Sequence, residues 1–258
     1  MLTGYALAGD GKKLVTMPSL ADVGDMTMAD LSDRIDAIAY RPFTGELLGF
    51  SKDGTIYTID PISGAMVNQE AKFDDGAVID GVAVAFDFNN KIDAVRAVGS
   101  DGANLVYFPS NFDDEKANTV KQFANIAYAD GDVNFGTKPM IFANAYTNAI
   151  SGQKASATFQ YALDASSNSL VSLANNEGTL ATIGKLKIDG VVADLATAGG
   201  FDIVTPEEGA DLAFAILQLD GAETSGLYSI NLESAEATLV ADLGVIGYTG
   251  FAVTLGDK

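Results

Sequence analysis

Residues 46–67 read ELLGFSKDGTIYTIDPISGAMV, and this stretch sets the pattern for the whole chain. It contains short runs in which apolar and polar residues alternate, and turn residues separate the runs. Asp53-Gly54 marks the first turn, because both residues tolerate the positive φ angles of tight hairpins. Pro61 and Gly64 mark the second turn. The stretch therefore predicts short β-strands joined by tight turns.

The same pattern returns elsewhere in the chain. Residues 93–111 and 212–240 both place an Asp-Gly pair at their first turn, and residues 158–184 form a degenerate copy. Repeats of about 40–50 residues with four strands per unit are typical of a β-propeller. The repeats therefore predict an all-β fold of the propeller type.

A short strand of small, mostly apolar residues precedes each repeat, as expected for strands that are buried on both sides. These inner strands are predicted at residues 35–40, 82–88, 140–146 and 200–204. Residues 248–255 look like a fifth inner strand with no repeat after it, whereas residues 5–17 contain later strands with no inner strand before them. We therefore predict one domain over residues 1–258, a single β-propeller of five four-stranded blades closed by pairing of the N- and C-terminal strands. Six blades are the alternative, since 258 residues divided by six gives 43 per unit.

Composition excludes several kinds of chemistry. The chain contains no cysteine, histidine or tryptophan, so disulfides, thiolate nucleophiles, Ser-His-Asp triads and imidazole metal sites are absent. Its 35 acidic and 15 basic residues give a net charge of −20, which disfavours nucleic acid and anionic membranes as partners. No apolar run of about 18 residues exists, so we expect no membrane span. A signal peptide is not visible at the N-terminus.

Short motifs spread over nearly the whole chain carry a family resemblance. They are YRP at 40–42, TGEL at 44–47, IYTIDP at 56–61, FDFN at 86–89, YADGDVN at 128–134, AYTN at 145–148, NNEGTL at 175–180 and GFDI at 200–203. With these motifs the chain resembles a bacterial family called domain of unknown function 4394. The resemblance implies a propeller-like domain, usually in exported proteins, with no established activity.

The first candidate metal site is the acidic turn that contains Asp130, Asp132 and Asn134. Alternating oxygen side chains can converge on one hard cation such as Ca²⁺. A calcium helix-loop-helix motif would need glycine and glutamate at the positions of Phe135 and Ile141, so the turn does not match that motif. The alternative is an ordinary acidic turn whose carboxylates accept hydrogen bonds from backbone N–H groups.

Further carboxylates lie at the predicted inner strands. Asp87 and Asp93 form a second candidate calcium site, and Asp36 and Asp202 lie in or beside other inner strands. In a propeller, such residues can line the central channel. Two carboxylates roughly 5–10 Å apart suffice for glycoside hydrolysis. A carbohydrate-binding or glycoside-cleaving propeller that uses channel carboxylates is therefore the alternative function.

Two of the three arginines, Arg41 and Arg96, lie at or within predicted strands. An isolated charge in a sheet usually needs a partner of opposite charge. We expect both arginines to tie blades together through aspartates or backbone oxygens.

No spacing in the sequence singles out a catalytic pair. We therefore expect a non-enzymatic structural or interaction module. We expect it to be extracellular or on a cell surface, and a particle-associated or cytoplasmic location is the alternative. Its expected partner is a protein or glycan surface, and Ca²⁺ is a candidate stabilising ion. Residues 111–118, 150–155 and 206–209 are polar or long enough to act as contact loops.

Overall fold

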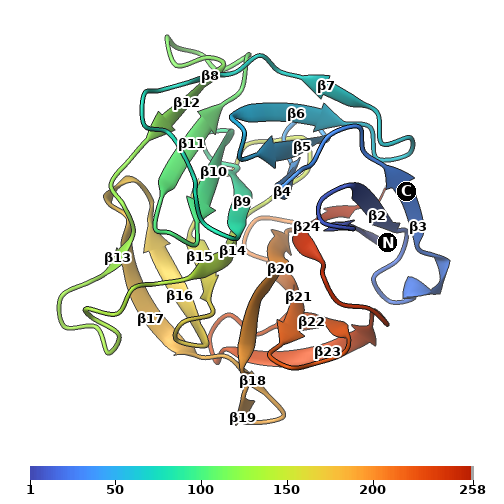
Figure 1. The fold of residues 1–258 in the computed structure, drawn as a ribbon, viewed down its shortest axis with the longest axis vertical. Helices are drawn as coiled ribbons and strands as arrows, with labels where there is room; N and C mark the ends of the chain where they lie inside the picture. The colour runs from blue at the N-terminus through green and yellow to red at the C-terminus, as the bar shows by residue number, and fades with distance from the viewer. Residues whose placement is uncertain (257–258) are drawn as a thin grey trace.

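The computed structural model describes residues 1–256, so the last two positions of the predicted domain lie outside the described residues. The described part consists of β-strands, turns and two 3-10 helices, Val23–Asp25 and Asn175–Glu177, and contains no α-helix. Figure 1 shows the sheets arranged around a common centre, with β4, β9, β14, β20 and β24 nearest to it. The predicted all-β class is confirmed.

The strands belong to four hydrogen-bonded sheets. The first contains β4 (Ala37–Arg41), β5 (Glu46–Ser51), β6 (Thr55–Ile59) and β7 (Met66–Asn68). The second contains β9 (Val84–Asn89), β10 (Ala94–Gly99), β11 (Asn104–Phe108) and β12 (Thr119–Gln122), with β8 (Lys72–Phe73) beside β12. The third contains β14 (Ile141–Tyr146), β15 (Gln160–Asp164), β16 (Ser169–Ala174) and β17 (Thr179–Lys185), with β13 (Ala127–Tyr128) beside β17.

The fourth sheet has ten strands and includes both ends of the chain. One part contains β20 (Leu195–Val204), β21 (Leu212–Leu219), β22 (Ser225–Ile230) and β23 (Glu236–Asp242), with β18 (Lys187–Ile188) and β19 (Val191–Val192) at its edge. The other part contains β24 (Thr249–Leu255), β1 (Leu2–Ala8), β2 (Lys13–Met17) and β3 (Thr27–Asp30). A single parallel pairing, Gly199 with Thr249, joins the two parts.

The terminal strands pair with each other, as the sequence predicts. β1 and β24 are antiparallel, with Leu2 opposite Leu255 and Ala6 opposite Phe251. The predicted inner strands are also present, as β4, β9, β14, β20 and β24. The glycines of the Asp-Gly turns have positive φ angles, for example +92° at Gly54 and +101° at Gly102, which explains why the turns need glycine.

Successive inner strands touch one another around the centre. β4 contacts β9, β9 contacts β14, β14 contacts β20, β20 contacts β24, and β24 contacts β4. Small residues permit this approach: a Cβ atom on Gly200 would lie 2.3 Å from the backbone nitrogen of Phe251. The hydrophobic clusters fill the spaces between neighbouring sheets, as where Phe50 of β5 packs against Phe86 of β9 with ring centroids 5.6 Å apart. The inner strands are therefore apolar because sheets cover them on both sides.

None of the helices in the described part of the chain has the length and apolarity needed to cross a membrane.

Candidate functional site

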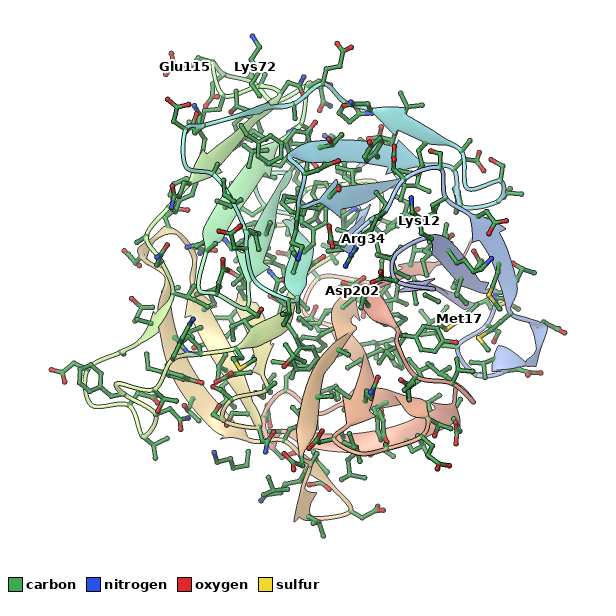
Figure 2. The ribbon with its side chains drawn as sticks, in the orientation of Figure 1. Lys12, Met17, Arg34, Lys72, Glu115 and Asp202 are labelled. Atoms are coloured by element: carbon green, nitrogen blue, oxygen red, sulfur yellow. The ribbon has the colours of Figure 1, made fainter. Side chains whose placement is uncertain are left out.

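Two carboxylates from different sheets lie at the centre of the molecule. Asp87 belongs to β9 and Asp202 to β20, and each residue is only 4% exposed. Figure 2 shows Asp202 near the middle of the view, where the inner strands converge. The fold thus brings together two of the aspartates that the sequence placed at inner strands.

Both carboxylates accept hydrogen bonds from the backbone of a neighbouring inner strand. Oδ2 of Asp87 accepts from the N–H of Tyr146 in β14 at 2.6 Å. Oδ2 of Asp202 accepts from the N–H of Val253 in β24 at 2.6 Å, while its Oδ1 accepts from the N–H of Ile203 at 2.7 Å. These bonds satisfy backbone donors at edges where no further strand is available. Each carboxylate therefore fastens its own inner strand to another one.

The electrostatic environment favours the protonated form of this pair. Burial raises the pKa of Asp202 to about 7, although the N–H groups of Val253 and Ile203 oppose the shift. Burial also raises the pKa of Asp87 well above its usual value, and the negative charge of Asp202 raises it further. Ionising both carboxylates at once is unfavourable, because they are buried and no cation neutralises their charges. The pair can therefore hold a proton near neutral pH.

The space beside Asp202 is very small. A pocket lined by Asp202, Tyr40 and Thr254 offers about 10 Å³ to the centre of a water-sized sphere. A second central pocket, lined by Asn144 and Phe251 but by neither carboxylate, also offers about 10 Å³. Either volume holds about one water molecule. The pocket beside Asp202 is therefore too small for a sugar ring.

Asp36, the other predicted channel carboxylate, has different partners. Its Oδ2 accepts from the backbone N–H of Lys52 at 2.8 Å, and its Oδ1 lies 3.2 Å from Nε of Arg34. Asp36 precedes β4 and borders a different cavity from Asp202. It therefore neutralises an arginine instead of joining the central pair.

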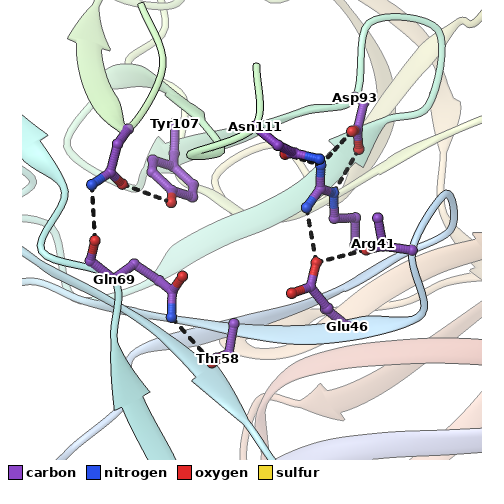
Figure 3. A network of polar contacts seen from close by, with 9 residues as sticks. Arg41, Glu46, Thr58, Gln69, Asp93, Tyr107 and Asn111 are labelled. Atoms are coloured by element: carbon purple, nitrogen blue, oxygen red, sulfur yellow. Dashed lines mark hydrogen bonds and ion pairs between the residues drawn. The ribbon is translucent and has the colours of Figure 1, made fainter. Parts of the chain in front are cut away.

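Asp93 lies in a buried ion-pair network that Figure 3 shows at close range. Nε of Arg41 donates to Oδ1 of Asp93 at 2.7 Å, and Nη2 donates to Oδ2 of the same carboxylate. Arg41 also donates to Oε2 of Glu46 at 2.8 Å and to Oδ1 of Asn111 at 2.7 Å. The first and second sheets are thus joined, which confirms that Arg41 ties sheets together through an aspartate.

The candidate calcium residues Asp87 and Asp93 consequently face different groups. Asp87 bonds to a backbone N–H of β14, whereas Asp93 pairs with the Arg41 guanidinium. The guanidinium supplies the positive charge that a cation would bring to Asp93. Calcium binding at these two residues stays a prediction.

Arg96 is also buried, but its partners differ from the prediction. Nε donates to the hydroxyl of Tyr146 at 2.9 Å, and Nη2 donates to Oδ1 of Asn176 at 2.8 Å. Its third partner is the side-chain oxygen of Asn104. The expectation of aspartate or backbone partners is wrong for this arginine, because amide and hydroxyl oxygens accept its hydrogen bonds instead.

The turn with Asp130, Asp132 and Asn134 is fixed to β17. Oδ2 of Asp132 accepts from the N–H of Thr182 at 2.6 Å, and its Oδ1 accepts from the N–H of Asn134 at 2.8 Å. Nδ2 of Asn134 donates to Oγ1 of Thr182 at 2.8 Å. Burial opposes ionisation of Asp132, but these hydrogen bonds outweigh it and lower its pKa.

The geometry matches the acidic turn that was the alternative to a metal site. Across the described residues, no three Asp, Glu, His or Cys side chains lie where they could jointly hold a metal ion. Calcium binding by Asp130, Asp132 and Asn134 stays a prediction.

One buried polar residue of an inner strand is missing from the predicted site residues. Asn144 of β14 is fully buried, and neither polar atom of its side chain has a hydrogen-bond partner. It is the only amide residue in the strand IFANAY, and all positions of that strand are buried. Its place in the centre becomes visible only when the sheets are assembled.

The family model for the domain of unknown function DUF4394 matches residues 15–252. The chain belongs to this family. A search of curated proteins finds no match.

Among solved structures, the DUF4394 domain is similar to a structural genomics protein of unknown function from Bacteroides thetaiotaomicron. The two chains share 13% identity with a TM-score of 0.53, and the match covers 97% of this chain but only 64% of that one. This likeness supports a propeller-like fold and nothing about activity.

Two other solved structures match over most of the chain. The glutaminyl cyclase of Myxococcus xanthus shares 9% identity with a TM-score of 0.40, and the match covers 96% of this chain and 73% of that one. U3-55K shares 12% identity with a TM-score of 0.39, and the match covers 96% of this chain and 66% of that one. Both superpose too loosely to support a conclusion about the DUF4394 domain.

Proposed function

We propose that the DUF4394 domain is a non-enzymatic binding module built on a rigid five-bladed propeller. The observation that carries this proposal is the state of the central carboxylates. Asp87 and Asp202 are the pair best suited to acid–base chemistry, yet both are buried and bonded to backbone N–H groups. A closed centre of this kind serves to hold the sheets, which leaves binding to the outer loops.

Three features support five closed blades. Each sheet, or half of the ten-stranded sheet, contains a run of four consecutive antiparallel strands. The five inner strands contact one another in a cycle that returns from β24 to β4. The pairing of β1 with β24 lets the two termini complete one blade. Closure removes exposed sheet edges at the termini and stiffens the scaffold.

The glycoside-cleaving alternative has one observation in its favour. A pKa of about 7 for Asp202 is suitable for a general acid near neutral pH. Burial alone produces this shift, however, and the neighbouring pocket has room for about one water molecule. Hydrolysis requires the glycosidic oxygen between two carboxylates. The proposal of a non-enzymatic module therefore accounts for more of the geometry.

A hydrolysis assay tests the proposal. We expect no turnover of a panel of polysaccharides and aryl glycosides by the intact chain, with or without Ca²⁺. Hydrolysis that disappears in both Asp87→Asn and Asp202→Asn would overturn the non-enzymatic proposal. The matched control is Asp93→Asn, because Asp93 is equally buried but pairs with Arg41.

We extend the proposal to the setting of the domain, outside the cell or on a particle, with a protein or glycan surface as partner. Its support is the family resemblance and the net charge of −20, which keeps an exposed module soluble. Ca²⁺ remains the candidate stabilising ion.

A further inference from the structure

The outermost strands of the sheets differ in how their outer edges are covered. β8 pairs with β12, and β13 pairs with β17. In the same way β18 pairs with β23, but only at Glu236 and Ala237. Figure 1 shows β18 and β19 beside one end of β23. The outer edge of β23 over residues 238–242, here called the β23 edge, therefore has no paired strand in the described part of the chain.

The third sheet shows how the corresponding edge of β17 is covered. β13 pairs with the first two residues of β17, as β18 pairs with the first two residues of β23. The fourth residue of β17, Thr182, donates its backbone N–H to Oδ2 of Asp132 at 2.6 Å. The fourth residue of β23 is Leu239, and a bulge follows the fourth residue in both strands. By this register the N–H of Leu239 points away from β22, and no loop or side chain within residues 1–256 accepts it.

The β23 edge is apolar and open to solvent. Leu239 is 54% exposed and Val240 is 38% exposed. The other outermost strands without a covering strand, β3 and β7, have only four and three residues, whereas β23 has seven. Natural proteins protect long exposed edges with lysine, proline or a covering segment. The sequence of β23, EATLVAD, contains neither lysine nor proline, so this edge can accept another strand.

Charge indicates which kind of strand fits the β23 edge. Glu236 begins β23 and Asp242 ends it, and neither makes an ion pair within residues 1–256. A second copy of the chain would bring the same acidic ends and a net charge of −20 to this edge. The bulge at Val240 also twists the edge, which disfavours a long flat pairing between two copies. A short segment with basic ends has the complementary charge.

We propose that the β23 edge binds an extended segment of a partner protein with an apolar centre and basic ends. The segment adds to the sheet as a further strand along residues 238–242, where one of its backbone carbonyls accepts the N–H of Leu239. Its apolar side chains cover Leu239 and Val240, and its basic ends face Glu236 and Asp242. Addition of a strand to an exposed sheet edge is a general mode of peptide recognition. This inference rests on the proposed binding function and names the partner class of one surface.

Amide hydrogen exchange measured by NMR with three matched peptides tests this inference. The first peptide is acetyl-Lys-Val-Thr-Val-Lys-amide. The second is the same peptide N-methylated at every residue, and the third has glutamate in place of both lysines. At saturation the first peptide should slow exchange of the Leu239 amide at least tenfold, and the other two should bind at least tenfold more weakly. Exchange of the Thr182 amide should not change, because Asp132 already accepts that N–H.

Two substitutions of exposed side chains locate the binding surface. Leu239→Lys places a cation on the β23 edge and should weaken binding of the first peptide about tenfold. Val67→Lys is the matched control, since it makes the same change in net charge at an exposed residue of β7, the outermost strand of the first sheet. It should change the affinity less than twofold at constant ionic strength.

Four results would overturn the inference. They are no protection of the Leu239 amide, equal binding of the N-methylated peptide, equal binding of the glutamate peptide, and equal effects of the two substitutions. Protection of Leu239 that rises with protein concentration in the absence of peptide would also overturn it, because a second copy would then occupy the edge. Failure at the β23 edge would leave the non-enzymatic proposal standing, whereas glycoside turnover would remove that proposal and leave the edge to be judged by hydrogen exchange.

Discussion

Buried carboxylates are stabilised in two different ways in this molecule. Asp93 lies between two sheets and pairs with the Arg41 guanidinium. Asp87 and Asp202 are buried to the same degree at the centre, but backbone N–H groups are their hydrogen-bond partners. Hydrogen bonds alone compensate the cost of burying a charged carboxylate less completely than a cation does. The pKa values of Asp87 and Asp202 are therefore raised. The first site is an ion pair, whereas burial at the second favours the protonated form.

The largest expected effect comes from breaking the ion pair. Arg41→Met leaves the Asp93 carboxylate buried and removes the contacts to Glu46 and Asn111. We expect a loss of about 3–5 kcal/mol in the free energy of unfolding, measured by urea denaturation. Arg34→Met is the matched control, since that guanidinium is 50% exposed and its loss should cost below about 1 kcal/mol. Equal losses in the two variants would show that burial does not govern these pairs.

The second prediction concerns the pH dependence of stability. The pKa of Asp202 is about 7 in the folded chain and 3.8 in an unperturbed group, so the proton stabilises the fold. This stabilisation is fully present below about pH 4 and is lost as the pH rises through 7. We expect the free energy of unfolding to fall by about 2 kcal/mol between about pH 5.5 and 7.

Thermal melts of Asp202→Asn sharpen this comparison. The variant is weaker at every pH, because an amide nitrogen would face one of two backbone N–H donors. Its melting temperature should nevertheless vary less between about pH 5.5 and 7 than that of the unaltered chain. In Asp93→Asn, the melting temperature should depend on pH as strongly as in the unaltered chain. If both variants keep it, the central pair does not hold the proton.

The smallest effect is expected at the acidic turn. Asp132→Ala removes three hydrogen bonds to Thr182 and Asn134 in a partly exposed site. We expect a loss of about 1–2 kcal/mol by urea denaturation, against less than about 0.5 kcal/mol for Asp130→Ala.

Calcium separates the two interpretations of that turn. If the turn is only a cap, Ca²⁺ should raise the melting temperature no more than Na⁺ at matched ionic strength. A calcium-specific increase that Asp132→Ala abolishes would establish the metal site.

Local patterns in the sequence predicted most of the fold. Asp-Gly turns and alternating strands depend on neighbouring residues, so their repetition predicted the sheets and the pairing of β1 with β24. Arg41 was predictable because a buried guanidinium needs an oxygen partner of opposite charge. The partners of Arg96 were not, since Asn and Asp oxygens serve equally well as acceptors.

The site was harder to predict than the fold. Asp87 and Asp202 lie in different repeats, and nothing in either local sequence reports the other. Long-range proximity of this kind follows from topology and leaves no spacing in the chain.

The most direct test of a closed, structural centre is amide hydrogen exchange measured by NMR at Tyr146 and Val253. Their N–H groups donate to Asp87 and Asp202. We predict that both amides exchange among the slowest in the protein, and that Asp87→Ala and Asp202→Ala each accelerate mainly the amide that loses its acceptor. Rapid exchange at both positions in the unaltered chain would contradict the account, because it would mean that solvent reaches the carboxylates freely.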